Sequence, residues 1–176
     1  LERPMPTTPM ELLAWMTGER LIAQVPAGGG YITNLGAISA ARSLRDFPDL
    51  DRKAVRVVVY DGLNKAKSKQ EREGTEGYAV SFQALLQFVM SLLPQSEVIE
   101  QALRRKRTVY PEIALREIIA NALIHQDFSA SGAGPMVEIF DDRVEFTNPG
   151  EPLVDPLRFV DTPPKSRNEA LASMMR

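Results

Sequence analysis

A largely apolar stretch between positions 110 and 128 (YPEIALREIIANALIHQDF) constrains the fold of this chain more than any other. Pro111 suits the first turn of a helix, and no glycine or further proline interrupts the residues that follow it. Glu117, Asn121 and His125 are spaced four apart. Because four residues advance about 40° around an α-helix, the three form one narrow polar stripe. Apolar residues border the stripe on both sides, so we expect it to be walled by apolar surface, where its groups need partners.

The composition excludes several kinds of site. The sequence has no cysteine and one histidine, so it holds no disulfide, thiol nucleophile or Cys/His zinc site. Its net charge of −2 gives no overall basic field for nucleic acid. No run of about 18 apolar residues predicts a membrane span, and no signal peptide is recognisable, so we expect a cytoplasmic protein without a membrane partner. The first residue is Leu1, and we therefore expect a fragment of a longer protein.

The first part of the chain, residues 1–95, predicts a helix–hairpin–helix–strand region. Thr8 and Glu11 form a capping box ahead of a helix. The β-branched run from Ala54 to Tyr60 predicts a strand near the centre of a sheet. The other expected elements are a hairpin (21–33), a helix (35–44), a solvated polar loop (61–76), an amphipathic helix (81–93) and a linker (95–109).

The second part, residues 96–176, predicts a smaller unit in which the 110–128 helix lies over a hairpin. Alternating apolar residues between 137 and 147 predict this hairpin, with a two-residue turn at Asp141-Asp142. A second capping box, Ser166–Glu169, opens a short helix. We therefore expect an α+β fold, a helix and strand N-terminal part followed by a truncated two-layer unit. Both parts can contribute strands to one sheet.

Three segments of the second part resemble one protein superfamily: LREIIANALIHQDF, VEIFDDRVEFTNPG and SRNEALA. They are similar to the ATPase module of histidine kinases, gyrase and MutL. More narrowly, they resemble its divergent version in bacterial proteins labelled RecG-related helicases or transcriptional regulators, where it follows a Schlafen-type AlbA-like DNA-binding region. The segments ITNLGAISAARSLRDFP and RKAVRVVVYDG resemble the end of that upstream region, so the resemblance covers about residues 30–176. It implies a histidine-kinase-like ATPase unit in a DNA-linked regulator.

The resemblance implies ATP and Mg²⁺ as cofactors and gives the polar stripe a role. In the superfamily this helix carries a glutamate that orients or deprotonates the attacking water, which corresponds to Glu117. An asparagine four residues later ligates the Mg²⁺ that bridges the phosphates, which corresponds to Asn121. The spacing agrees, because i,i+4 positions lie one turn apart on one face of a helix. His125 lies one turn further on, and it either contacts phosphate or is a satisfied core histidine.

The other nucleotide contacts that the resemblance implies lie after the hairpin. The superfamily has Asp-x-Gly there, with the aspartate accepting a hydrogen bond from the adenine amino group; this chain has Asn148-Pro149-Gly150. Asn148 can still accept, without the charge, or the tripeptide only ends the strand. Ser166 and Arg167 are either a helix cap and a surface residue or a phosphate site at a helix N-terminus. The superfamily's glycine-rich lid is not in the sequence, so we expect this fragment to be inactive alone.

Two other functions fit the sequence. The basic run Arg104, Arg105, Lys106 and Arg107 is either an exposed linker edge or a strip that contacts DNA phosphates. Residues 8–46 loosely resemble a winged-helix wing, so a DNA-binding domain is one alternative. The other is a degenerate module that retains the fold and serves protein interaction or homodimerisation, which the missing Asp of Asp-x-Gly favours. No G-x-x-x-x-G-K-[ST] loop is present, so a P-loop does not support the helicase label.

Overall fold

A computed structural model describes residues 6–26, 28–100, 103–158, 160–161, 163 and 165–175, with the backbone alone for 95–100 and 103–108. The fold is α+β, as predicted. The helices are α1 (Pro9–Gly18), α2 (Asn34–Ala40), α3 (Tyr78–Leu92), α4 (Glu112–His125) and α5 (Glu169–Met174), with short 3-10 turns η1 (Leu44–Asp46), η2 (Asp51–Lys53) and η3 (Pro156–Arg158). The strands are β1 (Ile22–Gln24), β2 (Gly30–Ile32), β3 (Arg56–Tyr60), β4 (Ser68–Glu73), β5 (Gln95–Glu100), β6 (Leu103–Thr108), β7 (Met136–Ile139) and β8 (Val144–Thr147). None of the described helices is long and apolar enough to cross a membrane.

Four strands form the central sheet in the order β4-β3-β7-β8. β3 runs parallel to β7, with Val57 opposite Val137, and both outer pairs are antiparallel. β3 and β4 precede residue 95 while β7 and β8 follow it, so both expected parts of the chain contribute to one sheet. Parallel neighbours need a long crossover connection. After the edge strand β4, the connection from β3 to β7 runs through α3, the β5–β6 hairpin and α4.

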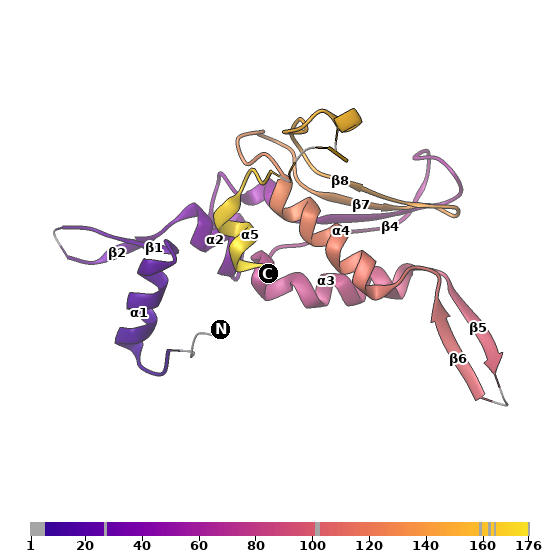
Figure 1. Cartoon of the computed structure of the whole chain (residues 1–176), viewed down its shortest axis with the longest axis horizontal. Helices are drawn as coiled ribbons and strands as arrows, with labels where there is room; N and C mark the ends of the chain where they lie inside the picture. Colours follow the sequence, from indigo (N-terminus) through magenta and orange to yellow (C-terminus); the bar gives the residue numbers. More distant parts are fainter. Residues whose placement is uncertain are drawn as a thin grey trace.

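The two longest helices, α3 and α4, pack against each other and cover one face of this sheet (Figure 1). Alternate strand residues point toward them and are buried: Val57 of β3, and Val137 and Ile139 of β7. The helices meet them with Leu86 and Val89 of α3 and with Leu115, Ile119 and Leu123 of α4. This core decides which side of α4 turns inward, and therefore where its polar stripe lies.

The expected polar loop at 61–76 is wrong in part, because Ser68–Glu73 forms the edge strand β4. All six of its residues are exposed. Its backbone pairs with β3, with Val58 opposite Glu71, while its charged side chains face water. Charged side chains keep an edge strand from pairing with other chains. The same charges remove the apolar alternation from which a strand is predicted.

Two hairpins project from opposite ends of the molecule (Figure 1). At one end, α1 leads into β1 and β2. The predicted capping box of α1 is present, with Thr8 Oγ1 accepting from the Glu11 N–H at 3.2 Å, yet none of its residues is buried. At the other end β5 and β6 form a hairpin where a linker was expected. The basic run 104–107 lies in β6, and its side chains lie outside the described residues.

Candidate functional site

The polar stripe lies on the solvent side of α4, where Glu117 and Asn121 are both exposed. The expected apolar wall is incomplete, because Ile113 is 78% and Ile118 43% exposed. The reason is the core, which packs against the line through Ile119 on the opposite side of the helix.

A hydrogen bond joins the two exposed members of the stripe. Asn121 Nδ2 donates to Glu117 Oε1 at 3.1 Å. Side chains at i and i+4 meet in this way on a helix surface. Since the amide nitrogen is engaged, Asn121 Oδ1 and the second oxygen of Glu117 are the acceptors left for a ligand or a cation.

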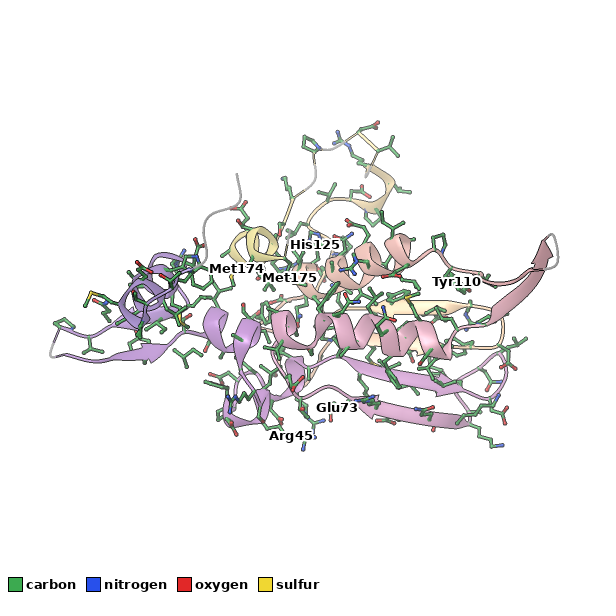
Figure 2. All side chains as sticks on the ribbon, turned by 90° about the horizontal axis from the view of Figure 1, so that it is seen from below. Arg45, Glu73, Tyr110, His125, Met174 and Met175 are labelled. Atoms are coloured by element: carbon green, nitrogen blue, oxygen red, sulfur yellow. The ribbon has the colours of Figure 1, made fainter. Side chains whose placement is uncertain are left out.

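A cavity of about 770 Å³, which we call the stripe cavity, lies against the stripe. Its polar lining comprises Arg116, Glu117, Asn121, His125, Lys165 and Ser166. Its apolar lining includes Ala172 and Met175, so α5 and the segment before it close the cavity against α4. Figure 2 labels His125 of α4 and Met175, which follows α5, and both line this cavity.

A second cavity of about 470 Å³, which we call the turn cavity, shares His125 and Lys165 with the stripe cavity. Asn148, Gly150 and Arg167 line it as well. Its remaining walls include the apolar residues Pro152, Leu153, Val154 and Pro163. It therefore combines apolar residues with several polar and charged groups.

The structure brings every residue of the sequence-predicted nucleotide site to these two cavities. Those in the stripe cavity are Glu117, Asn121, His125 and Ser166, and those in the turn cavity are His125, Asn148, Gly150 and Arg167. Lys165, which lines both cavities, was not predicted from the sequence. Its only sequence signal is a basic residue directly before Ser166. The capping box predicted at Ser166–Glu169 is wrong, because α5 begins at Glu169 with Asn168 at its N-cap and no side-chain cap bond.

The turn at Gly150 is held against the end of α4 through Asp127. The Asp127 N–H donates to Pro149 O at 2.7 Å. Gly150 has a φ of +112°, which favours glycine, and a Cβ there would lie 2.8 Å from Asp127 Cβ. Proline has no backbone N–H, but the contact with Asp127 uses the Pro149 carbonyl, so a proline is compatible with it. The position after strand β8 therefore requires Gly150 for its conformation and for this close approach.

Arg167 joins the same contact from the other side. Its Nη1 lies 3.4 Å from Asp127 Oδ2, and its Nη2 donates to Glu151 O at 2.7 Å. Hydrogen bonds from the Ser129 side chain and backbone to Asp127, with smaller contributions from Arg167 and Lys53, lower the pKa of the Asp127 carboxyl.

Lys53 fixes the loop that follows Asp127, a role that the sequence analysis did not assign. The residue is 2% exposed, and its Nζ donates to the carbonyls of Asp127, Ala130 and Ala133 at 3.2, 2.6 and 3.2 Å. Burial lowers the pKa of Lys53, partly offset by the Asp127 charge. Three carbonyl partners satisfy the three ammonium hydrogens, which makes the buried cation tolerable.

Asn168 secures the C-terminal end of α4. Its Nδ2 donates to Ile124 O at 2.7 Å and to Gln126 O at 2.8 Å, carbonyls that the end of the helix leaves without an intrahelical partner. Two donors of the neighbouring residues, Ser166 Oγ and Arg167 Nε, are buried and have no hydrogen-bond partner among the described residues.

The donor set fits Mg²⁺ that is held mainly by a ligand. The described residues contain no group of three or more His, Cys, Asp or Glu that could hold a metal ion. Glu117 and Asn121 present hard oxygen donors on one side of the stripe cavity. Mg²⁺ usually takes one or two protein oxygens and completes its shell with waters and phosphate oxygens. These two residues therefore suit a Mg²⁺ bound together with a phosphate ligand.

Comparison with known proteins gives two matches. Residues 132–176 match the family described as "Putative ATP-dependent DNA helicase recG C-terminal". The DIP2311 protein from Corynebacterium diphtheriae has a similar fold in its crystal structure, with a TM-score of 0.65 and 20% sequence identity over 86% of this chain. This chain spans 30% of the length of that protein. No curated protein matches the chain. The matched C-terminal quarter carries β7, β8 and every lining residue of the turn cavity except His125, and it is similar to the C-terminal part of that family.

Proposed function

We propose that this chain binds ATP with Mg²⁺ across the stripe and turn cavities. The observation that supports the proposal is that seven residues chosen from the sequence come together in space. They lie on three separate segments and line two cavities that share His125 and Lys165. The family match over residues 132–176 supports the same reading for the segments that supply Asn148, Gly150, Ser166 and Arg167.

The phosphates belong in the stripe cavity. Lys165, His125 and Ser166 line it, and the buried Ser166 hydroxyl has no hydrogen-bond partner within the part of the chain that the structure describes. Asn121 would hold Mg²⁺, which would neutralise phosphate charge and polarise the terminal phosphoryl group. Glu117 has a free carboxylate oxygen, so it would orient or deprotonate an attacking water.

The base belongs in the turn cavity. Its apolar residues, Pro152, Leu153 and Val154, suit a planar heterocycle, and Asn148 faces the same space. An amide both donates and accepts, whereas the carboxylate of the superfamily only accepts. Asn148 would thus accept from the adenine amino group while donating to a ring nitrogen.

Titration calorimetry with Mg²⁺-ATP tests the proposal. We expect Asn121→Ala to weaken binding about tenfold or more, because it removes the cation ligand. Asn64→Ala is the matched control, since Asn64 is exposed and its side chain accepts only a local bond from the Ala66 N–H at 3.0 Å. Glu117→Gln should retain binding and remove any hydrolysis. The proposal would be excluded if the wild-type chain did not bind Mg²⁺-ATP even at millimolar nucleotide concentrations.

At the level of the whole protein, we propose that this site serves a DNA-linked, RecG-related regulator, on the strength of the family match. An interaction module is the second candidate, because α1 exposes Met10 by 82%, Leu13 by 46% and Trp15 by 37%. Apolar patches of this kind mark interaction sites. Sedimentation analysis separates the two roles: association that Leu13→Glu abolishes, in the absence of nucleotide affinity, supports the interaction module alone.

A further inference from the structure

We propose that Asp127 is a positioning residue of the turn cavity, which sets ligand affinity without touching the ligand. The inference rests on the proposed function. Asp127 lines neither the stripe cavity nor the turn cavity. All of its polar groups are nevertheless engaged, and their partners lie on four different segments of the chain.

The backbone of Asp127 ties together two of these segments. Its N–H donates to Pro149 O at 2.7 Å, and its carbonyl accepts from Lys53 Nζ at 3.2 Å. The first bond fixes the distance between the end of α4 and the Gly150 turn. The second bond links Asp127 to Lys53, the buried last residue of η2. A Cβ added at Gly150 would lie 2.8 Å from Asp127 Cβ, so only a glycine lets the turn lie this close to Asp127.

The carboxylate engages the other two segments with separate oxygens. Oδ1 accepts from the Ser129 N–H at 2.9 Å and from Ser129 Oγ at 2.6 Å. Oδ2 faces Arg167 Nη1 at 3.4 Å. The same guanidinium donates to Glu151 O at 2.7 Å, so Arg167 spans from Asp127 to the wall of the turn cavity.

The consequence is an asymmetry between the two cavities. The wall that Asp127 supports, made by Gly150, Glu151 and Arg167, belongs to the turn cavity and not to the stripe cavity. Glu117 and Asn121 are held by their own helix and by their mutual hydrogen bond. Loss of the Asp127 contacts should therefore weaken ligands that use the turn cavity and leave ligands of the stripe cavity unaffected.

Two probes test this asymmetry by calorimetry: Mg²⁺-ATP, which would fill both cavities, and Mg²⁺-tripolyphosphate, which would fill the stripe cavity alone. We expect Asp127→Ala to weaken Mg²⁺-ATP about tenfold and to leave tripolyphosphate affinity unchanged. Asp127→Asn retains an acceptor for Ser129 and should weaken ATP less. If Asp127→Ala does not fold, Ser129→Ala takes its place. This change removes one hydrogen bond to Asp127, lies outside both cavities, and should also weaken Mg²⁺-ATP binding.

Asp61→Asn is the control for the loss of one negative charge, since Asp61 pairs with Lys67 and Lys69 away from both cavities. Equal weakening of both probes, or an unchanged ATP affinity in every Asp127 and Ser129 variant, overturns the positioning role while the nucleotide proposal stands. A wild-type chain that binds neither probe overturns both. A wild-type chain that binds only tripolyphosphate removes the base site, and the positioning role with it.

Discussion

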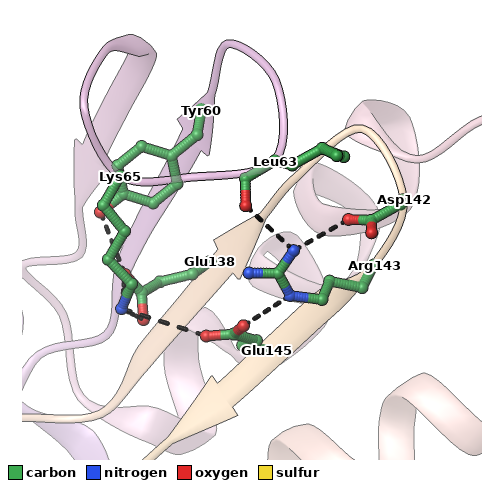
Figure 3. Close-up of polar contacts among 7 residues, drawn as sticks. All are labelled: Tyr60, Leu63, Lys65, Glu138, Asp142, Arg143 and Glu145. Carbon is green, nitrogen blue, oxygen red and sulfur yellow. Dashed lines mark hydrogen bonds and ion pairs between the residues drawn. The ribbon is translucent and has the colours of Figure 1, made fainter.

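The two faces of the central sheet are built from different chemistry. On the inner face, Val57, Val137 and Ile139 are buried under α3 and α4. On the outer face, Tyr60, Lys65 and Glu138 form a hydrogen-bonded group (Figure 3). The strands alternate so that one residue faces the core and the next faces this polar group. The inner face is thus stabilised by the burial of apolar side chains, and this group on the outer face by hydrogen bonds and an ion pair.

The outer face contains a buried carboxylate. Glu138 has a side chain that is 3% exposed, and it accepts from Tyr60 Oη at 3.0 Å and from Lys65 Nζ at 2.7 Å. Beside it, Arg143 lies over the Phe140 ring at 4.0 Å and pairs with Glu145 at 2.7 Å. The loop that carries Lys65 therefore covers this part of the sheet, where the inner face has helices.

The candidate site belongs to the inner side. α4 bears the stripe on one side and packs against the sheet with the other, so the core positions Glu117 and Asn121. The outer face has no residue in either cavity. Changes on the inner face should therefore alter both stability and ligand binding, whereas changes on the outer face should alter stability alone.

The largest effect is expected from Leu123→Ala on the inner face. Leu123 is 1% exposed in the core of α4, and its truncation leaves a cavity, so we expect a loss of about 2–5 kcal/mol in the free energy of unfolding. Ile113→Ala on the same helix is the control, since Ile113 is 78% exposed and should change stability by at most about 0.5 kcal/mol. Urea unfolding measures both, and equal losses would break the distinction between the two sides of α4.

A smaller effect is expected from Glu138→Gln on the outer face. The change removes the charge that Lys65 pairs with and leaves donors facing each other, so we expect a loss of about 1–3 kcal/mol. The loss is limited because Lys65 is 56% exposed and can turn to water. Ligand affinity should stay unchanged.

Glu145→Gln is the matched control for this variant. Its partner Arg143 is 41% exposed and Glu145 itself 38%, so we expect a loss of at most about 1 kcal/mol in urea unfolding. If Glu145→Gln lowers the free energy of unfolding more than Glu138→Gln does, the burial of Glu138 is not what makes its contacts stabilising.

The sequence allowed prediction of elements with a strong apolar period and of residues within them. The helix at α4, the β7–β8 hairpin and the capping box of α1 were all predicted from local pattern. Seven of the residues that line the two cavities were chosen by resemblance, whereas Lys165, which lines both, was not. Local pattern is informative here because each element carries its own start, stop or alternation signal.

The remainder depends on contacts between distant segments, which one sequence does not reveal. β4 is a charged edge strand that has no apolar alternation in its sequence, and it becomes a strand through its pairing with β3. Lys53 looks like a surface lysine until the carbonyls of the 127–133 loop surround it. The inward side of α4 was also not determined, because apolar residues border the stripe on both sides and only the sheet decides which are buried.

The smallest effect is expected at the rim of the outer face, from the acid titration of Asp61. Its carboxylate pairs with Lys67 at 2.8 Å and with Lys69 at 2.9 Å, and these contacts lower its pKa from 3.8 to about 2. In the unfolded chain the pKa returns to about 3.9. A folded pKa below the unfolded one stabilises the fold above about pH 4, and this contribution is lost as the pH falls through about 2.

NMR titration of the Asp61 carboxyl carbon measures this directly. We expect a midpoint near 2 in the wild-type chain and a higher midpoint in Lys69→Met, which loses one of the two partners. Asp61→Asn should flatten the fall of the melting temperature between about pH 4 and 2, because the variant no longer takes up this proton on unfolding. Added salt should raise the wild-type midpoint, since exposed pairs are screened. A wild-type midpoint near 3.9 at low salt would mean that the pairs at this rim contribute nothing, and that pairing on the outer face is confined to the buried Glu138 group.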